Sequence, residues 1–150
     1  MDAVTYPNAK VAEYVNANVV AVRIGHEEEP LAGRYLVKWT PRLFVLDPEE
    51  TTHHQIMGFL PPDEFVPFLY LGRAKAAFHA DRLDEAAEML DQLLQETPAS
   101  ASAPEAVFLR GVSRFKKDHD KSHLQKVYRT LRQDYPGSDW APRGFPYWNL

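Results

Sequence analysis

The sequence predicts a chain of two parts: an α/β part over residues 1–66 and an all-helical part over residues 67–150. Two observations lead to this prediction. The first part contains a nearly continuous β-branched run, residues 19–24, which is typical of a strand covered on both faces. The second part repeats its apolar pattern 38 positions later, which is typical of stacked helical hairpins. With 45% hydrophobic residues, the 150-residue chain can bury a core.

The first part opens with a helix. Thr5 or Asn8 can cap free backbone N–H groups at its start. Val11, Val15 and Val19 then recur at helical spacing. The β-branched run follows directly, and its expected burial on both faces predicts a parallel sheet with helices packed on it.

An acidic loop at residues 25–30 separates that run from a short helix at residues 31–36. The loop contains Glu27, Glu28 and Glu29. General acid–base catalysis needs carboxylates in distinct environments, so that their pKa values separate. A solvated run of glutamates provides no such difference, and we interpret it as a surface loop.

Two further strands complete the sheet pattern. Residues 42–46 form a strand, preceded by Pro41, which cannot donate a hydrogen bond to a ladder and belongs at a strand's start. Residues 47–50 have turn chemistry, and residues 53–59 predict an antiparallel partner strand. A long helix begins at residues 61–63 and continues into the second part without a flexible linker.

The second part contains an internal repeat, because residues 70–98 align with residues 108–136 at a constant offset of 38. Small or aromatic residues recur on the first helix of each hairpin, and apolar residues recur on the second. The matched pairs are Tyr70 and Phe108, Ala74 and Val112, Ala77 and Phe115, Ala86 and Leu124, Leu90 and Tyr128, Leu93 and Leu131, and Pro98 and Pro136. The repeat predicts four antiparallel helices over residues 67–136.

The segment at residues 81–87, with a proline twelve residues after Ala86, resembles the tetratricopeptide family. The resemblance covers residues 67–136 and implies a scaffold that binds proteins. Two hairpins are fewer than the roughly three repeats that usually stabilise such an array. We therefore expect the aromatic tail to cover its open end. The aromatic residues of the tail are Trp140, Phe145, Tyr147 and Trp148.

The first part resembles the thioredoxin fold. The resemblance rests on Trp39, Thr40 and Pro41 before the strand at residues 42–46, and on a final strand and glycine at residues 56–59. It implies an incomplete thioredoxin-like sheet with a structural cis-proline loop at Thr40 and Pro41. The alternative interpretation of these two residues is a plain tight turn. The sequence departs from the family because it contains no Cys-x-x-Cys motif.

Residues 1–5 resemble the stretch that follows the redox motif in thioredoxin-like proteins with a helical-repeat extension. In that fold the preceding strand lies between the strands expected at residues 19–24 and 42–46, so its loss exposes unpaired backbone groups. We expect two chains to meet there as a symmetric homodimer. The alternative is that residues 19–24 pair directly with residues 42–46 in one chain.

The complete absence of cysteine excludes disulfide exchange, thiolate metal sites, iron–sulfur clusters and a cysteine nucleophile. The sequence also contains no nucleophile elbow, phosphate-binding loop or zinc-protease helix motif. We therefore expect no cofactor. No signal or transmembrane segment is recognisable, so no membrane partner and a cytoplasmic location are the default expectations.

Although the net charge is −4, one segment of the chain is basic. From Arg110 to Arg132 it contains eight Lys and Arg, and its acidic residues are Asp118 and Asp120. Such a run can attract a phosphate backbone, but on a helical hairpin it is more often a solvated face. We expect no nucleic-acid partner, and we expect an acidic peptide in a groove lined by the first helices of the two hairpins. The residues expected to line this groove are Lys75, His79, Ser113, Lys116 and Lys117.

Two pairs of histidines are candidate metal ligands. His53 and His54 are adjacent, so in a strand their rings point to opposite faces and cannot share one metal. His119 and His123 have i, i+4 spacing with aspartates beside them, which suits zinc or nickel on one helix. They straddle a predicted turn between helices, so we expect no metal site.

Two functions from different classes follow from these patterns. The favoured one is a non-catalytic protein-interaction module built on a redox-inactive thioredoxin-like fold with tetratricopeptide-like helices. The alternative is a fragment of a thioredoxin-like protein-disulfide oxidoreductase whose Cys-x-x-Cys strand lies upstream of Met1. The two hypotheses differ in what the reading frame encodes before Met1.

Overall fold

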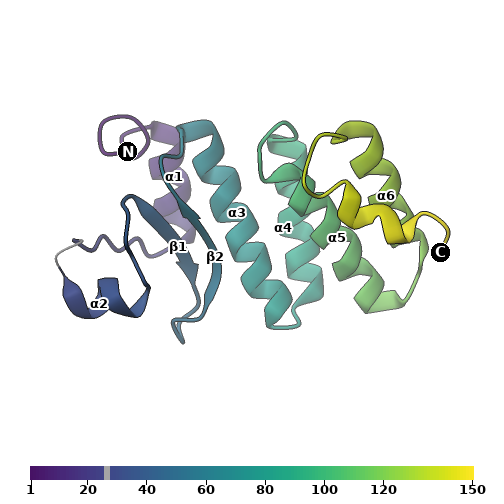
Figure 1. Ribbon diagram of the computed structural model, residues 1–150, viewed down its shortest axis with the longest axis horizontal. Helices are drawn as coiled ribbons and strands as arrows, with labels where there is room; N and C mark the ends of the chain where they lie inside the picture. The colour runs from purple at the N-terminus through teal and green to yellow at the C-terminus, as the bar shows by residue number, and fades with distance from the viewer. Residues whose placement is uncertain (26–27) are drawn as a thin grey trace. The chain divides into compact units, whose positions relative to one another are not determined.

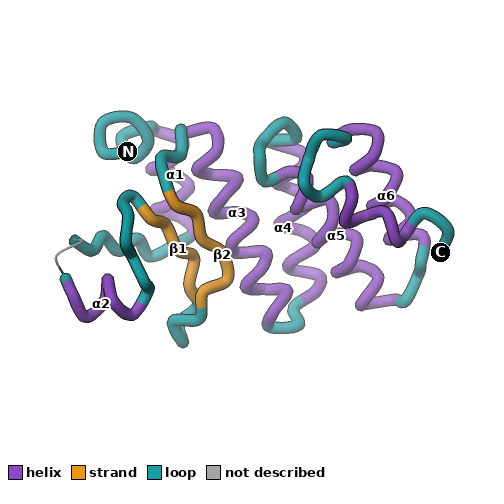
Figure 2. Tube along the Cα trace, viewed as in Figure 1, coloured by secondary structure: helices purple, strands orange, loops and turns teal. Residues whose placement is uncertain are grey.

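The structure is a computed structural model that describes residues 1–25 and 28–150 (Figure 1). The chain forms two compact units, unit 1 (Met1–Val66) and unit 2 (Pro67–Leu150), and helix α3 (Pro62–His79) contributes residues to both. Within the described residues the protein is mostly helical, with one two-stranded antiparallel sheet (Figure 2). The predicted combination of strands and helices is therefore present, with helices dominating.

Helix α1 (Ala9–Asn18) begins where the sequence predicts. The side-chain oxygen of Asn8 accepts hydrogen bonds from the backbone N–H groups of Lys10 (3.0 Å) and Val11 (3.3 Å). These N–H groups have no partner inside the first helical turn, so the Asn8 cap fixes the start of the helix. Val11 is the buried residue of α1.

The sheet pairs β1 (Arg42–Leu46) with β2 (Thr52–Met57). Both strands and their antiparallel pairing are confirmed, and β2 starts one residue earlier than predicted. Asp47 closes the intervening turn by accepting a hydrogen bond from the Thr51 N–H at 2.8 Å. Aspartate stabilises turns in this way because its short side chain reaches nearby backbone N–H groups.

Residues 19–24 do not form a strand, so the prediction of a third strand and of a parallel sheet is wrong. The segment is irregular, and its side chains lie in solvent: Val20 is 93% and Val22 is 75% exposed. An extended segment becomes a strand only when a neighbour satisfies its backbone groups. No strand of the described residues does so, and the alternative pairing with β1 within one chain does not occur.

Helix α2 (Glu29–Arg34) begins two residues before the predicted short helix, because Pro30 fits the first helical turn. The acidic loop predicted before it includes residues 26–27, which lie outside the described residues. Glu28 accepts a hydrogen bond from the Gly25 N–H at 3.2 Å through its side chain.

Unit 1 has a small core. Its buried apolar side chains among the described residues are Val11, Val45, Leu60 and Phe65. Thr5 is also buried, and its hydroxyl donates to the Leu60 carbonyl at 2.6 Å. The Tyr6 ring packs edge-on against Phe65, with 5.8 Å between centroids. A unit of this size buries a low fraction of its surface and is marginally stable without further contacts.

Unit 2 continues from α3 with three α-helices and one 3-10 helix in its described residues. These are α4 (Leu83–Glu96), α5 (Ala103–Asp118), α6 (Ser122–Asp134) and η1 (Pro142–Tyr147). The prediction of four helices across residues 67–136 is confirmed. Figure 1 shows α4, α5 and α6 side by side, with η1 against α6.

The two hairpins share backbone details at the predicted offset of 38 residues. Asp81 and His119 follow the first helix of each hairpin, and both are left-handed, with φ of 58° and 61°. Thr97 and Tyr135 follow the second helices with similar backbone angles, and each N–H bonds to the carbonyl four residues earlier. A left-handed non-glycine residue costs about 1–2 kcal/mol. Its recurrence at equivalent positions therefore indicates one hairpin geometry used twice.

The turn after each second helix also repeats. The Ser100 N–H donates to the Thr97 carbonyl and the Ser138 N–H donates to the Tyr135 carbonyl, both at 3.1 Å. Helices α5 and η1 then begin within one residue of equivalent positions, each with a proline in the first turn. In the order of the repeat, η1 therefore stands where the first helix of a third hairpin would begin.

The tail covers part of the open end, as expected. The rings of Trp140 and Tyr147 lie 5.1 and 5.8 Å from the ring of Phe108, in contact with the buried cluster. That cluster consists of Val107, Val127 and Leu131. Phe145 and Trp148, by contrast, remain 59% and 58% exposed. Two of the four tail aromatics thus close the core and two face solvent.

Candidate interaction surfaces

The three lysines expected in the groove are each paired with a carboxylate of unit 2. The pairs are Lys75 with Glu105 at 2.5 Å, Lys116 with Asp81 at 3.1 Å, and Lys117 with Asp84 at 2.5 Å. Lys116 also lies over the Phe78 ring, with its Nζ 4.9 Å from the centroid. An acidic peptide would therefore have to exchange with carboxylates that the chain itself supplies.

Ser113 does not project into a groove, contrary to expectation. It is fully buried, and its hydroxyl donates to the Leu109 carbonyl at 2.8 Å. A serine inside a helix satisfies its hydroxyl by this bond to the preceding turn when no solvent reaches it. His79 is exposed at the end of α3, with its ring 5.9 Å from the Phe78 ring.

The basic run of α5 faces the acidic side of α4. Arg110 pairs with Asp91 at 3.0 Å, and Arg114 bonds the second oxygen of the same carboxylate. Together with the pairs of Lys116 and Lys117, these contacts connect the two hairpins of unit 2. Partly exposed ion pairs contribute only about 0–1 kcal/mol each, so they favour the register of the helices more than their stability. Much of the basic charge on α5 is thereby neutralised within the chain.

Two aspartates hold the turn between α5 and α6. Asp118 accepts a hydrogen bond from the Asp120 N–H at 2.8 Å and lies 2.9 Å from Nε2 of His123. The Asp120 N–H, and then the His123 side chain, lower the pKa of Asp118. Asp120 accepts from the N–H and hydroxyl of Ser122, which lower its own pKa. In the described part of the chain, no group of three or more acidic or histidine side chains is arranged to hold a metal ion.

These hydrogen bonds predict that the α5–α6 turn is sensitive to acid. The folded-state pKa of Asp118 lies below its unfolded value of about 3.9, so its stabilising contribution is present above that value and is lost as pH falls through the folded pKa. We expect Asp118→Ala to melt at a lower temperature than the parent at pH ~6, with the difference shrinking by pH ~2. Melting followed by circular dichroism measures this.

The matched control is Asp139→Ala, because the Asp139 side chain is exposed and makes no hydrogen bond or ion pair within the described residues. Its melting temperature should stay close to that of the parent across the same pH range. A difference for Asp118→Ala that stays constant with pH would contradict the assigned role of the carboxylate.

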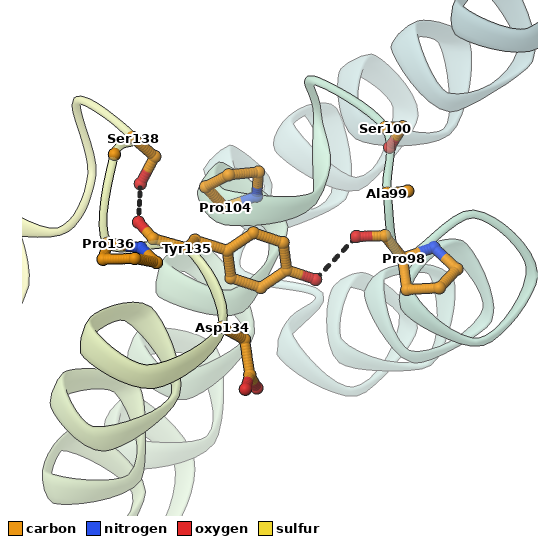
Figure 3. A pocket seen from close by; sticks show the side chains of 9 residues that line it. Pro98, Ala99, Ser100, Pro104, Asp134, Tyr135, Pro136 and Ser138 are labelled. Carbon is orange, nitrogen blue, oxygen red and sulfur yellow. Dashed lines mark hydrogen bonds between the residues drawn. The ribbon is translucent and has the colours of Figure 1, made fainter.

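A shallow, open cavity lies where the two repeated turns meet (Figure 3). It is lined by Pro98, Ala99, Ser100 and Pro104, and by residues 134–138. The Tyr135 hydroxyl donates to the Pro98 carbonyl at 2.7 Å, and the Ser138 hydroxyl donates to the Tyr135 carbonyl at 2.9 Å. Burial, together with the nearby Asp134 carboxylate, raises the pKa of Tyr135. The Tyr135 hydroxyl thus connects the two turns through its hydrogen bond to Pro98.

The Ser100 hydroxyl beside this cavity is buried and has no hydrogen-bond partner within the described residues. A serine becomes a nucleophile only when a base lies within hydrogen-bond reach. No histidine or lysine lines the cavity. The arrangement therefore provides no catalytic pair, and we interpret the cavity as the junction between repeated turns.

Unit 1 exposes many large apolar side chains. Among its described residues these are Val4, Tyr6, Val20, Val22, Ile24, Leu36, Trp39, Leu46, Met57 and Phe59. Single exposed apolar residues are normal, and a contiguous apolar surface is what marks a site that another polypeptide covers. They outnumber the large apolar residues that the same unit buries.

The loop before β1 lies at the end of the sheet. The Thr40–Pro41 peptide bond is cis, and the Gly58 N–H donates to the Pro41 carbonyl at 2.8 Å. Trp39, next to this loop, is exposed. β2 occupies one edge of β1, and no other strand of the described residues pairs with the second edge.

One of the two histidines of β2 bonds to the turn that follows β1. His53 is largely buried, with its Nε2 2.8 Å from a carboxylate oxygen of Asp47. This hydrogen bond lowers the pKa of Asp47. It connects β2 to the turn that follows β1, which is a structural role.

Comparisons with protein-family models, curated proteins and solved structures found no match to this chain. None of the helices in residues 1–25 and 28–150 combines the length and apolar character required to cross a bilayer. Function must therefore be inferred from the surfaces described above.

Proposed function

We propose that this protein is a non-catalytic protein-interaction module, built on a redox-inactive thioredoxin-like unit and two tetratricopeptide-like hairpins. The observation that carries the proposal is the large set of apolar side chains that unit 1 leaves in solvent. The hairpin geometry repeated at an offset of 38 supports the second part, because stacked hairpins form extended binding surfaces. A cytoplasmic location and the absence of a cofactor stay predictions.

The first partner in this proposal is a second copy of the chain. Residues 19–24 are rich in β-branched residues and pair with no strand of the described residues, and β1 pairs with a strand on one edge only. Exposed strand-forming segments and open edges attract other strands. In a symmetric dimer each copy supplies both features. Residues 19–24 of each copy can then pair with β1 of the other copy, which gives two equivalent pairings. Burying one valine side chain contributes about 1.5–3 kcal/mol.

The double substitution Val20→Asp and Val22→Asp tests this partner. Both side chains are exposed in the single chain, so the substitutions should leave its folding intact. In a dimer they would place carboxylates in an apolar interface, which is unfavourable. We expect the parent to sediment as a dimer at ~10 µM and the variant to sediment as a monomer, a loss of affinity of about tenfold or more.

A matched variant, Ala80→Asp with Ala99→Asp, adds the same charge at exposed positions of unit 2. It should sediment like the parent. A monomeric parent, or a variant at positions 20 and 22 that dimerises as well as the parent, would count against the homodimer.

The groove expected to hold an acidic peptide is retained only as a secondary proposal. Its lysines are engaged by Asp81, Asp84 and Glu105. An incoming peptide would replace existing ion pairs, so little net free energy is available from charge alone. The buried Ser113 is no longer included among the proposed contacts.

The alternative proposal is a fragment of a thioredoxin-like protein-disulfide oxidoreductase. The order of β1, β2, Gly58 and α3 favours it, since the resemblance implies the same order. The chain has no cysteine, so thiol chemistry would have to come from elsewhere. A reading frame upstream of Met1 that encodes a β-branched run ending in Cys-x-x-Cys would support this alternative, and unrelated sequence would leave the interaction module favoured.

A further inference from the structure

The cations of α6 have no acidic partner, unlike those of α5. Lys126, Arg129 and Arg132 are exposed, and none forms an ion pair with a described residue. They recur every three residues, which places them on neighbouring rows of one helix face. Ser122, Gln125 and Gln133 lie three or four residues from these cations, and none of the three has a carboxylate side chain.

An aromatic ring lies directly beside Arg132, the last of these cations. The Arg132 guanidinium donates to the Tyr128 hydroxyl at 2.5 Å and lies 5.9 Å from the Tyr128 ring. Tyr128 in turn meets Phe145 of η1 edge to face, with centroids 6.3 Å apart. Phe145 and, three residues later, Trp148 are exposed. Arg132, Tyr128 and Phe145 therefore form a chain of contacts from α6 to η1, and Arg129 and Lys126 follow toward the start of α6.

The structure holds this surface in place. Gly144 is buried, and a Cβ built there would lie 3.2 Å from Leu131 Cδ1 and 3.5 Å from the backbone of Tyr128. The Gln125 side chain also donates to the Leu150 carbonyl at 2.8 Å. These contacts fix the tail against α6 while Phe145 and Trp148 stay in solvent. Exposed aromatic residues on a fixed support bind partners at low entropic cost.

We infer that this basic-aromatic surface (Tyr128, Lys126, Arg129, Arg132, Phe145 and Trp148) binds an acidic peptide segment that carries apolar side chains between its carboxylates. Arg, Trp and Tyr are the residues that contribute most to protein–protein binding. Carboxylates of the peptide would complement the three cations, and its apolar side chains would cover the two exposed rings. The inference rests on the proposed role as an interaction module, and it assigns that role a partner other than a second copy.

The dimensions favour a short peptide over a nucleic acid. From Lys126 to Arg132 the helix rises only about 9 Å, which an extended peptide covers with about three residues. Asp120 and Asp134 lie at the two ends of α6, where they would repel a longer polyanion. The whole chain also carries a net charge of −4. A nucleic-acid strand would extend beyond the three cations, and the surrounding negative charge would repel its phosphates.

Fluorescence anisotropy with three labelled probes tests the inference on the full chain. The probes are a six-residue peptide that alternates Glu with Leu and Trp, the same peptide with Gln in place of Glu, and a twelve-nucleotide oligo-dT. We expect the acidic peptide to bind about tenfold more tightly than the Gln peptide at low salt, and this difference to fall as salt is added. The oligo-dT should bind more weakly than the acidic peptide.

The substitution pair Lys126→Glu and Arg129→Glu should weaken binding of the acidic peptide by about tenfold or more. Phe145→Ala with Trp148→Ala should weaken it without removing the salt dependence. The control pair Lys10→Glu and Lys38→Glu makes the same charge change at exposed positions of unit 1 and should leave affinity within about twofold. Circular dichroism confirms that each variant folds.

Equal affinity for the acidic and Gln peptides, tighter binding of oligo-dT, or equal effects of the α6 pair and the control pair would each overturn the inference. The sedimentation state of the same samples is recorded in parallel. If the chain is a dimer but does not bind the acidic peptide, only the inferred peptide-binding surface is wrong. A monomer that binds the peptide refutes the homodimer alone, so the two failures are distinguishable.

Discussion

Replacing Gly111 by Ala should lower the free energy of unfolding by about 1–3 kcal/mol or more, because α5 and α6 touch at this point. A Cβ at Gly111 would lie 2.1 Å from Cγ2 of Val127 and 3.2 Å from the His123 carbonyl oxygen. The first distance is far inside van der Waals contact, so the two helices must separate or Val127 must leave its rotamer. Urea unfolding followed by circular dichroism at 222 nm measures the change.

The matched controls are glycines with free space around them. No heavy atom lies within 4 Å of a Cβ built at Gly137 or Gly33. Gly33 is inside α2, where Ala is favoured over Gly by about 0.5–1 kcal/mol, so Gly33→Ala should be neutral or slightly stabilising. If Gly111→Ala is as stable as these controls, the close contact of α5 and α6 is wrong.

Replacing Leu131 by Ala should cost about 2–5 kcal/mol, the range for emptying a fully buried leucine site. Leu131 has no exposed surface and belongs to the cluster with Val107 and Val127. It also lies beneath Gly144 of η1, so the cavity would loosen the tail as well as α6. Trp140 packs against this cluster, and its fluorescence should shift toward that of exposed tryptophan in the variant.

Leu93 is the equivalent residue of the first hairpin and is equally buried. Leu93→Ala should therefore cost a similar amount, whereas Leu36→Ala, at an exposed position, should change stability by less than about 0.5 kcal/mol. A small loss at Leu131 with a large loss at Leu93 would contradict equivalent packing of the two hairpins.

The helical part could be predicted from sequence because its determinants are local. Asn8 caps the first helix through backbone groups two and three residues away. The apolar pattern that aligns Leu93 with Leu131 gives both positions complete burial. The cap depends on near neighbours in the chain, and the shared burial follows from an apolar pattern with a fixed period.

The strand at residues 19–24 could not be predicted correctly, because a strand depends on a partner that the segment itself does not encode. Its β-branched composition is typical of strands, yet propensity reflects packing against neighbours more than a backbone preference. The described residues provide no such neighbour, and Val20 and Val22 lie in solvent. Composition therefore indicated a preference for pairing, and not the pairing itself.

The prediction of the candidate groove did not include the carboxylates that neutralise its lysines. Ion pairs such as Lys117 with Asp84 join positions 33 residues apart, and nothing in the basic run of α5 reveals them. The unpaired cations of α6 were inside the same run and could not be separated from the paired ones. A helical-wheel comparison of α4 with α5 offers a signal, because Asp84 and Asp91 recur at helical spacing on α4.

We propose that unit 1 presents an unpaired strand segment and an open sheet edge to another polypeptide. Hydrogen–deuterium exchange of the backbone amides in residues 19–24 and in β1, at ~1 µM and ~100 µM chain, tests this claim most directly. If two copies pair, the amides of residues 19–24 should exchange fast at the lower concentration, and the amides of residues 19–24 and of β1 should be strongly protected at the higher one. Fast exchange of residues 19–24 at both concentrations would contradict it.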